Sequence, residues 1–523
     1  MKKYRLIGIT LMLCACFGSG CGKSAPKEFV IVAGSENESL QPLLAQFGQK
    51  NSVTLTLKYK GSVDIMQDLG QADIPYDAVW PANSLWLSLG DKNRKVKDAQ
   101  SIMTSPVVFG IKKSLAEKLD FVGKTVQVKD LLAAIRQKQL SFLMTSATQS
   151  NSGAAAYIGF LYALLGNPDM ITSDLLRTPQ LRKDIKELLG GVNRSSGSSG
   201  WLKDLFLNGN YDAMVNYEAV LIETNQALVK QGKEPLYLVY PVDGIVFSDS
   251  PLGYIEHGDP NKAELFKKLQ AYLLSDEIQA QILKMGRRTG VAGMMGAVDN
   301  QIFNPAWGID VKKILSPIKL PAAEVIQEAL SMYQGEFRKP SFTVFCLDFS
   351  GSMADNGGAK QVKEAMKLLL QPELAKQYLL NPSSEDVTIV IPFNNYPREL
   401  WQVVGSKAAD LAGLLGKIEA LTPNDGTNIY DPPIKGLEQM AAVKLENYVP
   451  AIILMTDGQS NAGTYESFER AWKNFGKDVP VFSIMFGDAS EEQLTPLAQL
   501  TRGRVFDGRK DLIAAFRTAK GYN

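Results

Sequence analysis

Two stretches that are almost wholly apolar, each ending in an aspartate, constrain the fold of this chain most. The stretch FTVFCLD ends at Asp348, and the stretch AIILMTD ends at Asp457. Continuous apolar runs of this length predict strands that are buried on both faces, as in a parallel sheet covered by helices. Strand and helix patterns alternate around them from residue 341 to residue 523. We therefore predict a doubly wound, Rossmann-like α/β domain over residues 341–523.

Oxygen-bearing side chains gather where these strands end. The loop DFSGS places Asp348, Ser350 and Ser352 at alternate positions, and the loop NDGT carries Thr427 just before a helical pattern. In doubly wound folds, ligands collect beyond the carboxyl ends of the strands, which is also where Asp457 lies. Carboxylate and hydroxyl oxygens are hard ligands that suit Mg²⁺, an ion that keeps several waters and needs few protein ligands. The pattern predicts a divalent-cation site formed by these five residues.

This set of residues resembles the metal-ion-dependent adhesion site of von Willebrand factor A domains. That family has a D-x-S-x-S loop, a single threonine and a later aspartate at a strand end, and all five positions match here. The resemblance implies that Ser350, Ser352 and Thr427 contact the cation directly or through water, while Asp348 and Asp457 supply charge. It also implies that Mg²⁺, or Mn²⁺ or Ca²⁺ in its place, keeps one coordination position open. An Asp or Glu carboxylate of a protein partner would fill that position.

The N-terminus has the pattern of an export signal. Lys2, Lys3 and Arg5 precede an apolar run from residue 6 to residue 13, which is far shorter than the roughly 20 residues of a membrane span. The small residues and cysteines that follow resemble a bacterial lipoprotein signal, which implies that one cysteine receives lipid. Cys21 in GSGC and Cys16 in LCAC both fit, and we favour Cys21. No later segment reaches about 18 uninterrupted apolar residues, so lipid would be the only membrane anchor.

Residues 28–300 show a second alternation of strand and helix patterns. Residues 53–60 alternate apolar and polar side chains, which indicates a half-buried strand. Other strand patterns lie at 29–35, 76–80, 106–111, 141–147, 213–220 and from residue 236, and helical patterns include 151–166, 174–189, 261–275 and 276–286. This alternation predicts an α/β domain with mostly parallel strands.

Small loops rich in glycine and hydroxyl groups stand at the junctions between these strands and helices. Backbone N–H groups and hydroxyls at helix N-termini suit an oxyanion or a carboxylate, although serine and asparagine are also ordinary helix caps. The loops are Gly34-Ser35, Gly61-Ser62, Ser146 to Gly153, and the loop from Ser195 to Gly200.

With an export signal in front of it, this order of elements resembles the bacterial extracellular solute-binding proteins of the molybdate, sulfate and iron type. The resemblance implies a periplasmic-binding-protein-like domain of two lobes that close by a hinge around a small molecule or anion. Trp80, Tyr217 and Glu218 are candidates for the wall of the cleft, where Glu218 would disfavour a multivalent anion. The side chains expected to line the cleft are Ser35, Ser62, Thr148, Asn151 and Ser152.

The domain organisation follows from these patterns. We expect a signal peptide at residues 1–20, a tether at 21–27, the solute-binding-like domain at 28–300 and the von Willebrand factor A domain at 341–523. Residues 301–340 are punctuated by prolines and contain one helical pattern near 321–335, so they are interpreted as an inter-domain linker with a helix.

Charge and histidine content exclude several functions. A formal net charge of +1 gives no electrostatic basis for binding nucleic acid. His257 is the one histidine in the sequence, which rules out a histidine-rich zinc site and makes a Ser-His-Asp triad unsuitable. Cys346 lies in an apolar strand, where a structural role is expected. We therefore do not expect an enzyme.

The predicted function is that of a lipid-anchored, extracytoplasmic protein of the cell envelope. Its von Willebrand factor A domain would bind a protein partner in an Mg²⁺-dependent manner, and its N-terminal domain would act as a ligand sensor or a scaffold. A substrate-binding receptor of an ABC-type uptake system is the alternative. A metal-dependent hydrolase is a third and weaker hypothesis, because no base is evident beside the cation site.

Overall fold

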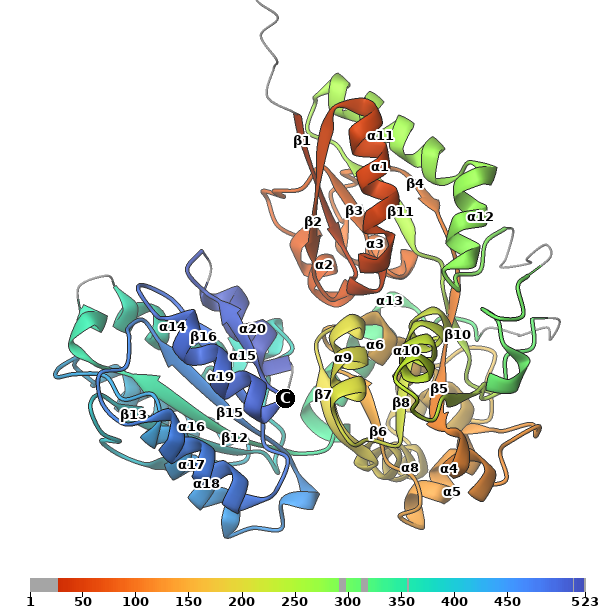
Figure 1. The fold of residues 1–523 in the computed structure, drawn as a ribbon. Coiled ribbons are helices and arrows are strands. Elements are labelled where there is room, and N and C mark those ends of the chain that lie inside the picture. Colours follow the sequence, from red (N-terminus) through yellow and green to blue (C-terminus); the bar gives the residue numbers. More distant parts are fainter. Residues whose placement is uncertain (1–26, 291–297, 312–317, 355–356, 511, 522–523) are drawn as a thin grey trace, which may run out of the picture.

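The chain folds into two lobes and a separate C-terminal domain, each built around one sheet (Figure 1). The structure, a computed structural model, describes residues 27–290, 298–311, 318–354, 357–510 and 512–521. The predicted signal peptide and both candidate lipid-bearing cysteines, Cys16 and Cys21, lie outside the described residues. Within the described residues, no helix combines the length and the apolar character that crossing a membrane requires.

The first lobe is a five-stranded sheet in the order β2-β1-β3-β11-β4, with helices packed against it. Its apolar core lies between the sheet and helices α1, α11 and α12. The elements are β1 (Lys27–Ala33), η1 (Ser35–Leu40), α1 (Gln41–Asn51), β2 (Val53–Tyr59), α2 (Ser62–Leu69), β3 (Ala78–Trp80), α3 (Ser84–Gly90), β4 (Val96–Ser101), β11 (Pro251–Ile255), α11 (Pro260–Leu273) and α12 (Asp276–Lys284).

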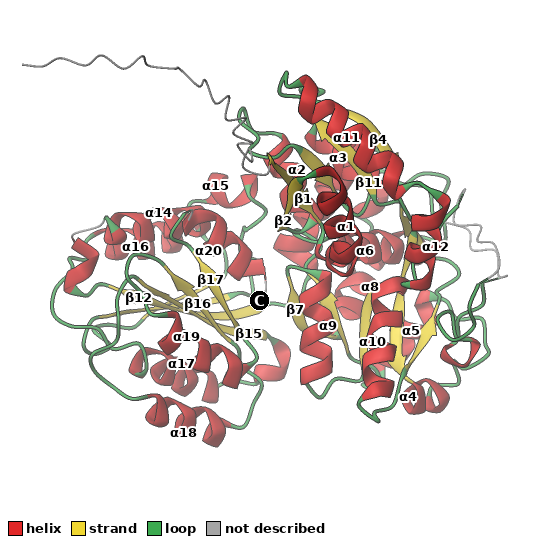
Figure 2. Cartoon of the chain, turned by 45° about the horizontal axis from the view of Figure 1, so that its top comes forward, coloured by secondary structure: helices red, strands yellow, loops and turns green. Residues whose placement is uncertain are grey.

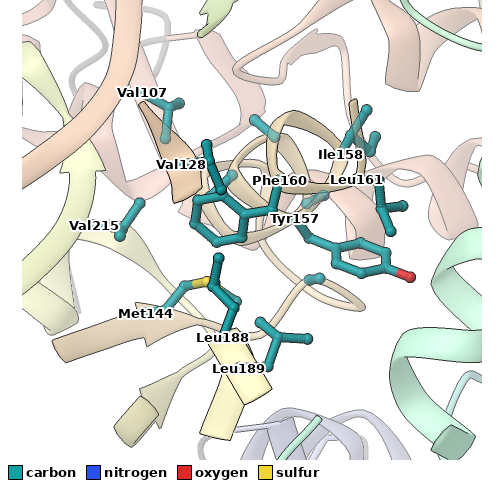
Figure 3. Close-up of a cluster of buried hydrophobic side chains, with 14 of the residues drawn as sticks. Val107, Val128, Met144, Tyr157, Ile158, Phe160, Leu161, Leu188, Leu189 and Val215 are labelled. Carbon is teal, nitrogen blue, oxygen red and sulfur yellow. The ribbon is translucent and has the colours of Figure 1, made fainter. Parts of the chain in front are cut away.

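The second lobe contains a six-stranded sheet in which β10, β5, β8, β6 and β7 follow one another and β9 also pairs with β5. The helix α6 is buried along most of its length, and Figure 3 shows the apolar cluster around it. The elements are β5 (Ser105–Lys112), α4 (Lys113–Lys118), α5 (Val128–Arg136), β6 (Phe142–Thr145), α6 (Asn151–Leu164), α7 (Ser173–Leu176), α8 (Pro179–Gly190), β7 (Val192–Ser196), α9 (Ser199–Asn208), β8 (Ala213–Tyr217), α10 (Glu218–Lys230), β9 (Leu236–Val239) and β10 (Val246–Ser248).

The prediction of mostly parallel strands for residues 28–300 is wrong. The pairs β1–β2, β1–β3, β6–β7 and β6–β8 are parallel, but β11 runs antiparallel to β3 and β4, and β5 runs antiparallel to β8, β9 and β10. The chain passes from the first lobe to the second between β4 and β5 and returns between β10 and β11. These crossing strands enter each sheet against the direction of their neighbours, which periodicity within single strands does not reveal.

The predicted linker packs as part of the second lobe. Phe303 and Trp307, the latter in the short turn η3 (Pro305–Trp307), are buried in an apolar cluster with residues of α9, α10 and β9. The helix α13 (Ala323–Met332) and the π-helical turn η4 (Tyr333–Phe337) cover α6, and the Tyr157 hydroxyl donates a 2.9 Å hydrogen bond to the carbonyl of Ala329. Burial of its apolar side chains therefore holds this segment against the lobe.

The C-terminal domain is the doubly wound sheet that the sequence predicts. The strand order is β14-β13-β12-β15-β16-β17, all pairs are parallel except β13–β14, and helices cover both faces (Figure 2). The elements are β12 (Ser341–Asp348), η5 (Gly351–Ala354), α14 (Gly358–Leu370), α15 (Pro372–Gln377), β13 (Val387–Phe393), β14 (Trp401–Val404), α16 (Ala408–Glu419), α17 (Asp431–Ala441), η6 (Leu445–Asn447), β15 (Val449–Thr456), α18 (Tyr465–Phe475), β16 (Val481–Met485), α19 (Glu491–Thr501), β17 (Arg504–Asp507) and α20 (Leu512–Gly521).

The C-terminal domain contacts both lobes. On the second lobe, Arg194 is 2% exposed and donates to a carboxylate oxygen of Asp478 at 3.0 Å and to the carbonyl of Arg502 at 3.1 Å. From the last helix, α20, Arg517 donates to Asp64 of the first lobe at 3.2 Å. The carbonyl of Arg517 accepts a 2.7 Å hydrogen bond from Gln149 of the second lobe. One helix turn of the C-terminal domain therefore bridges the two lobes.

Candidate functional site

The carboxyl end of β12 carries a buried aspartate. Every residue of β12 is buried, and Asp348 is 0% exposed at the end of the strand, between β13 and β15. Its two carboxylate oxygens accept hydrogen bonds from the Ser350 N–H at 2.8 Å and from the Thr456 hydroxyl at 2.6 Å. Because neighbouring parallel strands end at the same edge of the sheet, the position of Asp348 is fixed by the strands on both sides.

Two serines link this aspartate to the end of β15. The hydroxyl oxygens of Ser350 and Ser352 lie 3.2 Å apart, and the Ser352 hydroxyl donates to Oδ1 of Asp457 at 2.9 Å. Ser350 and Asp457 are buried, whereas Ser352 is exposed. The cluster therefore opens to solvent on the side of Ser352.

The loop that carries Thr427 reaches the same place. Its N–H donates to the side chain of Asn461 at 3.0 Å, which holds the loop against the end of β15. A Cβ atom on Gly458 would lie 3.2 Å from the Ser352 hydroxyl and 3.4 Å from the Thr427 hydroxyl, so both hydroxyls face the same small space. The structure thus brings together all five residues that the sequence assigns to the cation site.

The chemistry of this group fits a hard divalent cation. It offers two carboxylates and three hydroxyls, and it contains no sulfur or imidazole ligand that would select a softer metal. Burial, with a further contribution from the Asp457 carboxylate, raises the pKa of Asp348 to about 6. Among the described residues, no cluster of three or more His, Cys, Asp or Glu side chains could hold a metal. A cation at this edge would therefore depend on the hydroxyl oxygens as well.

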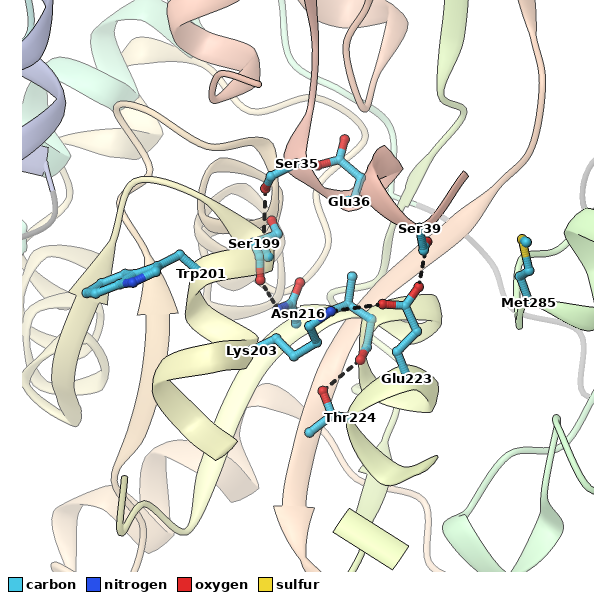
Figure 4. A network of polar contacts seen from close by, with 12 residues as sticks. Ser35, Glu36, Ser39, Ser199, Trp201, Lys203, Asn216, Glu223, Thr224 and Met285 are labelled. Carbon is cyan, nitrogen blue, oxygen red and sulfur yellow. Dashed lines mark hydrogen bonds and ion pairs between the residues drawn. The ribbon is translucent and has the colours of Figure 1, made fainter. Parts of the chain in front are cut away.

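In the N-terminal domain, the loops predicted to form a cleft meet between the two lobes. The Ser35 hydroxyl accepts a 3.1 Å hydrogen bond from the N–H of Gly200 in the other lobe (Figure 4). Next to Ser62, the N–H of Val63 donates to the carbonyl of Gln149 at 3.0 Å, again across the lobes. The Ser62 hydroxyl itself accepts from the N–H of Ala82 at 3.0 Å, within the first lobe.

The remaining predicted cleft residues also bond to protein atoms. Asn151 accepts from the Trp86 indole at 2.7 Å and donates to the hydroxyls of Tyr217 and Ser248 at 3.0 and 2.8 Å. The Ser152 hydroxyl lies 2.8 Å from those of Thr145 and Ser199. Thr148 points elsewhere, because its hydroxyl lies 3.0 Å from that of Ser146 and 3.4 Å from the side-chain oxygen of Gln334 in η4. The assignment of all five residues to a ligand stays a prediction.

A small cavity lies between the lobes, and most of its lining escaped the sequence reasoning. Its volume is about 20 Å³, and Glu36, Thr104, Arg287 and Tyr217 are among the residues that line it. Buried oxygens of Glu36, Thr104 and the adjacent Asn37 have no hydrogen-bond partner among the described residues. These residues come from segments far apart in the sequence, and no local pattern marks them.

Charged side chains hold the lobes together beside this cavity. Arg287 donates to the Glu36 carbonyl at 2.7 Å, to the Ser39 hydroxyl at 2.6 Å and to a Glu223 oxygen at 2.8 Å. Figure 4 shows Ser39 and Glu223 facing each other across the lobes. Glu218 is fully buried and takes both of its hydrogen bonds from the Arg288 guanidinium, at 2.7 and 2.8 Å. Its charge is therefore compensated within the protein.

We predict that Glu36 makes the protein less stable as the pH rises. Burial raises the pKa of Glu36 from 4.5 to about 7. Between these values the folded chain keeps a proton that the unfolded chain has lost, so stability falls through this window and stays reduced above pH 7. Glu36→Gln should stabilise the protein by about 1–3 kcal/mol at pH 8 and have little effect at pH 4, as measured by scanning calorimetry.

The matched control for this prediction is Glu38→Gln, because Glu38 is an exposed glutamate in the same turn. That variant should show the same unfolding temperature as the wild type at both pH values. A stabilisation by Glu36→Gln that is equal at pH 4 and pH 8 would contradict the proposed ionisation.

Comparisons with known proteins agree with this two-part architecture. Residues 29–288 match the family "Bacterial extracellular solute-binding protein", and residues 343–506 match the "von Willebrand factor type A domain". No curated protein matches the chain.

Solved structures similar to this chain fall into the same two groups. The periplasmic binding protein AfuA from Actinobacillus pleuropneumoniae, with bound fructose-6-phosphate, is 12% identical, and the match covers 60% of this chain and 98% of AfuA at a TM-score of 0.45. The sulfate-binding protein SubI from Mycobacterium tuberculosis is 17% identical, with 57% and 96% covered at a TM-score of 0.40. A von Willebrand factor type A protein from Catenulispora acidiphila is 19% identical, with 36% and 44% covered at a TM-score of 0.29. This chain thus joins a domain of the bacterial extracellular solute-binding type to a von Willebrand factor type A domain.

Proposed function

We propose that this protein is an extracytoplasmic binding protein whose C-terminal domain binds a protein partner through a divalent cation. The observation that carries the proposal is the convergence of five oxygen-bearing side chains at one edge of the sheet. Asp348, Ser350, Ser352 and Asp457 are linked by hydrogen bonds, and the Thr427 hydroxyl faces the same space as that of Ser352. Such a group suits Mg²⁺, with Mn²⁺ or Ca²⁺ as substitutes.

The cation would supply an electrophilic centre for an oxygen ligand of the partner. Ser350, Ser352 and Thr427 would hold it with their hydroxyls, and Asp348 and Asp457 would balance its charge. The exposure of Ser352 leaves one side of the group open to a partner. An Asp or Glu carboxylate is the partner group that best fits a partly hydrated cation of this type.

Binding is favoured over catalysis by the chemistry of the other reactive residues. Cys346 is fully buried in β12, and burial raises the pKa of its thiol, so it is not an activated nucleophile. His257 is exposed, and its ring lies 2.8 Å from the backbone carbonyl of Tyr76, in a different domain from the cation site. Both matched domain types are binding modules, which places a metal-dependent hydrolase last among the hypotheses.

The N-terminal domain is proposed to act as a ligand sensor or a scaffold for the C-terminal domain. The bridge that α20 makes to Asp64 and Gln149 supports a mechanical link, because a change in the angle between the lobes would move one of these contacts relative to the other. A ligand that opened or closed the lobes would then alter the position of the C-terminal domain.

A receptor for an uptake system is the second candidate function, and the interlobe cavity is the observation that favours it. Its unpartnered buried oxygens on Glu36 and Thr104 would accept hydrogen bonds from a ligand. Those oxygens favour a ligand with donor groups, such as a sugar or an amino acid, over a bare anion.

Removal of Asp348 tests the cation-dependent function. We expect wild-type protein to bind one Mg²⁺ or Mn²⁺ in calorimetric titrations, and Asp348→Ala to weaken that binding at least about tenfold. Immobilised wild-type protein should capture an envelope partner with Mg²⁺, whereas chelator or Asp348→Ala should abolish capture.

Asp507→Asn is the matched control, because Asp507 also ends a strand of this sheet but pairs with Arg509. It should bind the cation and the partner as the wild type does. Capture that is equal with Mg²⁺, with chelator and with Asp348→Ala would refute the cation-dependent model.

The receptor hypothesis predicts a ligand for the cleft. In a thermal-shift screen of the whole protein against sugars, amino acids and anions, at least one class should raise the unfolding temperature. Thr104→Ala should reduce that rise, since it removes an oxygen from the cavity wall, while Ser84→Ala, on the exposed surface of α3, should not. A screen without any stabilising compound would favour a scaffold.

Lipid attachment is proposed at Cys21, with Cys16 as the alternative. Labelling with a radioactive fatty acid in a bacterial host should be lost in Cys21→Ser and retained in Cys16→Ser. The reverse result would assign the anchor to Cys16, and labelling of neither protein would rule out the lipid anchor.

A further inference from the structure

A second cavity lies where the C-terminal domain meets the second lobe. Its volume is about 40 Å³, which is space for about three water-sized atoms, because one buried water needs roughly 10–15 Å³. The second lobe contributes Thr148 and Ser195, the segment after α13 contributes Arg338, and α20 contributes Arg517 and Lys520. Figure 1 marks the C-terminus in this region, between the two domains.

The charged residues that line this cavity are all basic. They are Arg338, Lys339, Arg517 and Lys520. The nearest carboxylates lie outside the lining: Asp386 pairs with the terminal nitrogens of Arg338, and Asp64 pairs with Arg517.

Several buried polar atoms of the lining lack a hydrogen-bond partner within the described part of the chain. These are the Nε atoms of Arg338 and Arg517, the Ser195 hydroxyl and the side-chain oxygen of Gln149. Buried polar groups are nearly always paired, so a group of them beside a cavity indicates a ligand or ordered water. Three of the four atoms are hydrogen-bond donors, which selects a ligand rich in acceptors.

Burial also penalises the ammonium groups here. Desolvation lowers the pKa of Lys520 to about 8, although its ammonium donates to the Thr343 hydroxyl at 3.0 Å. Desolvation likewise lowers the pKa of Lys339. A small anion in the cavity would offset this penalty, because an opposite charge favours the protonated form of a lysine.

We propose that this junction cavity binds one inorganic phosphate ion. Its oxygens would accept hydrogen bonds from Arg338, Arg517 and Ser195, and the ammonium of Lys520 would balance its charge. Phosphate suits the site better than sulfate or chloride because hydrogen phosphate also carries an O–H group, which the unpartnered oxygen of Gln149 can accept. The small volume excludes phosphate esters of larger molecules.

The bound ion has a structural consequence, because its ligands come from both domains and from the segment between them. Phosphate would bridge α20 to the second lobe and stabilise the docked position of the C-terminal domain. This site is separate from the interlobe cavity and from the cation site, and it shares no lining residue with either.

The test is equilibrium dialysis of the full chain against radioactive phosphate. We expect about one phosphate per chain, and a dissociation constant that rises at least about tenfold in Lys520→Met and about threefold or more in Ser195→Ala. Methionine has a similar volume to lysine and removes a desolvated charge, so the fold should tolerate it. Ser195→Ala removes an unpartnered hydroxyl, and it keeps the test decisive if Lys520→Met fails to fold.

Two control variants separate this site from other sources of binding. Lys186→Gln breaks an exposed ion pair with Glu385 across the same domain boundary, and Thr104→Ala alters the interlobe cavity. Both should bind phosphate as the wild type does, and neither chloride nor glucose 6-phosphate should displace the ion. The proposal is overturned by an absence of binding, by displacement with glucose 6-phosphate, or by loss of binding in Thr104→Ala with retention in Lys520→Met.

Discussion

The position of β12 is the constraint on which the candidate cation site depends. This strand is buried along its whole length, and it pairs in parallel with β13 on one side and β15 on the other. Its apolar side chains fix the register on both faces, and parallel pairing brings the ends of β12 and β15 to one edge of the sheet. Asp348 and Asp457 are therefore adjacent because of the packing of residues that take no part in binding.

The N-terminal domain is held by a different kind of interaction. Its lobes are joined by polar and charged contacts, such as those of Arg287 with Glu223 and of Asn151 with Trp86. A buried pair such as Glu218 and Arg288 depends on both partners, because either charge left alone in this environment would be strongly destabilising. Polar contacts of this type can exchange with a ligand or with water, so they suit a boundary between lobes that opens and closes.

The accuracy of the sequence analysis differed between the two halves for a physical reason. In the C-terminal domain, long apolar strands and amphipathic helices carry strong periodic signals, and every predicted strand from FTVFCLD to RVFDG is present. In the N-terminal domain, β7 and β11 were missed, because VNRSS and PLGYI show neither clear alternation nor a continuous apolar run. The predicted linker proved to be part of a core, since its apolar residues are too widely spaced for a periodic signal.

The sequence by itself determined the fold class of both domains and the five residues of the candidate cation site. It could do so because strand periodicity and the D-x-S-x-S spacing are local properties of the chain. The tertiary structure decided how the domains meet, which residues line the interlobe cavity, and that Thr148 belongs to the domain junction. Residues such as Glu36 and Arg287, or Ser195 and Lys520, are hundreds of positions apart and become neighbours only through packing, which no local pattern encodes.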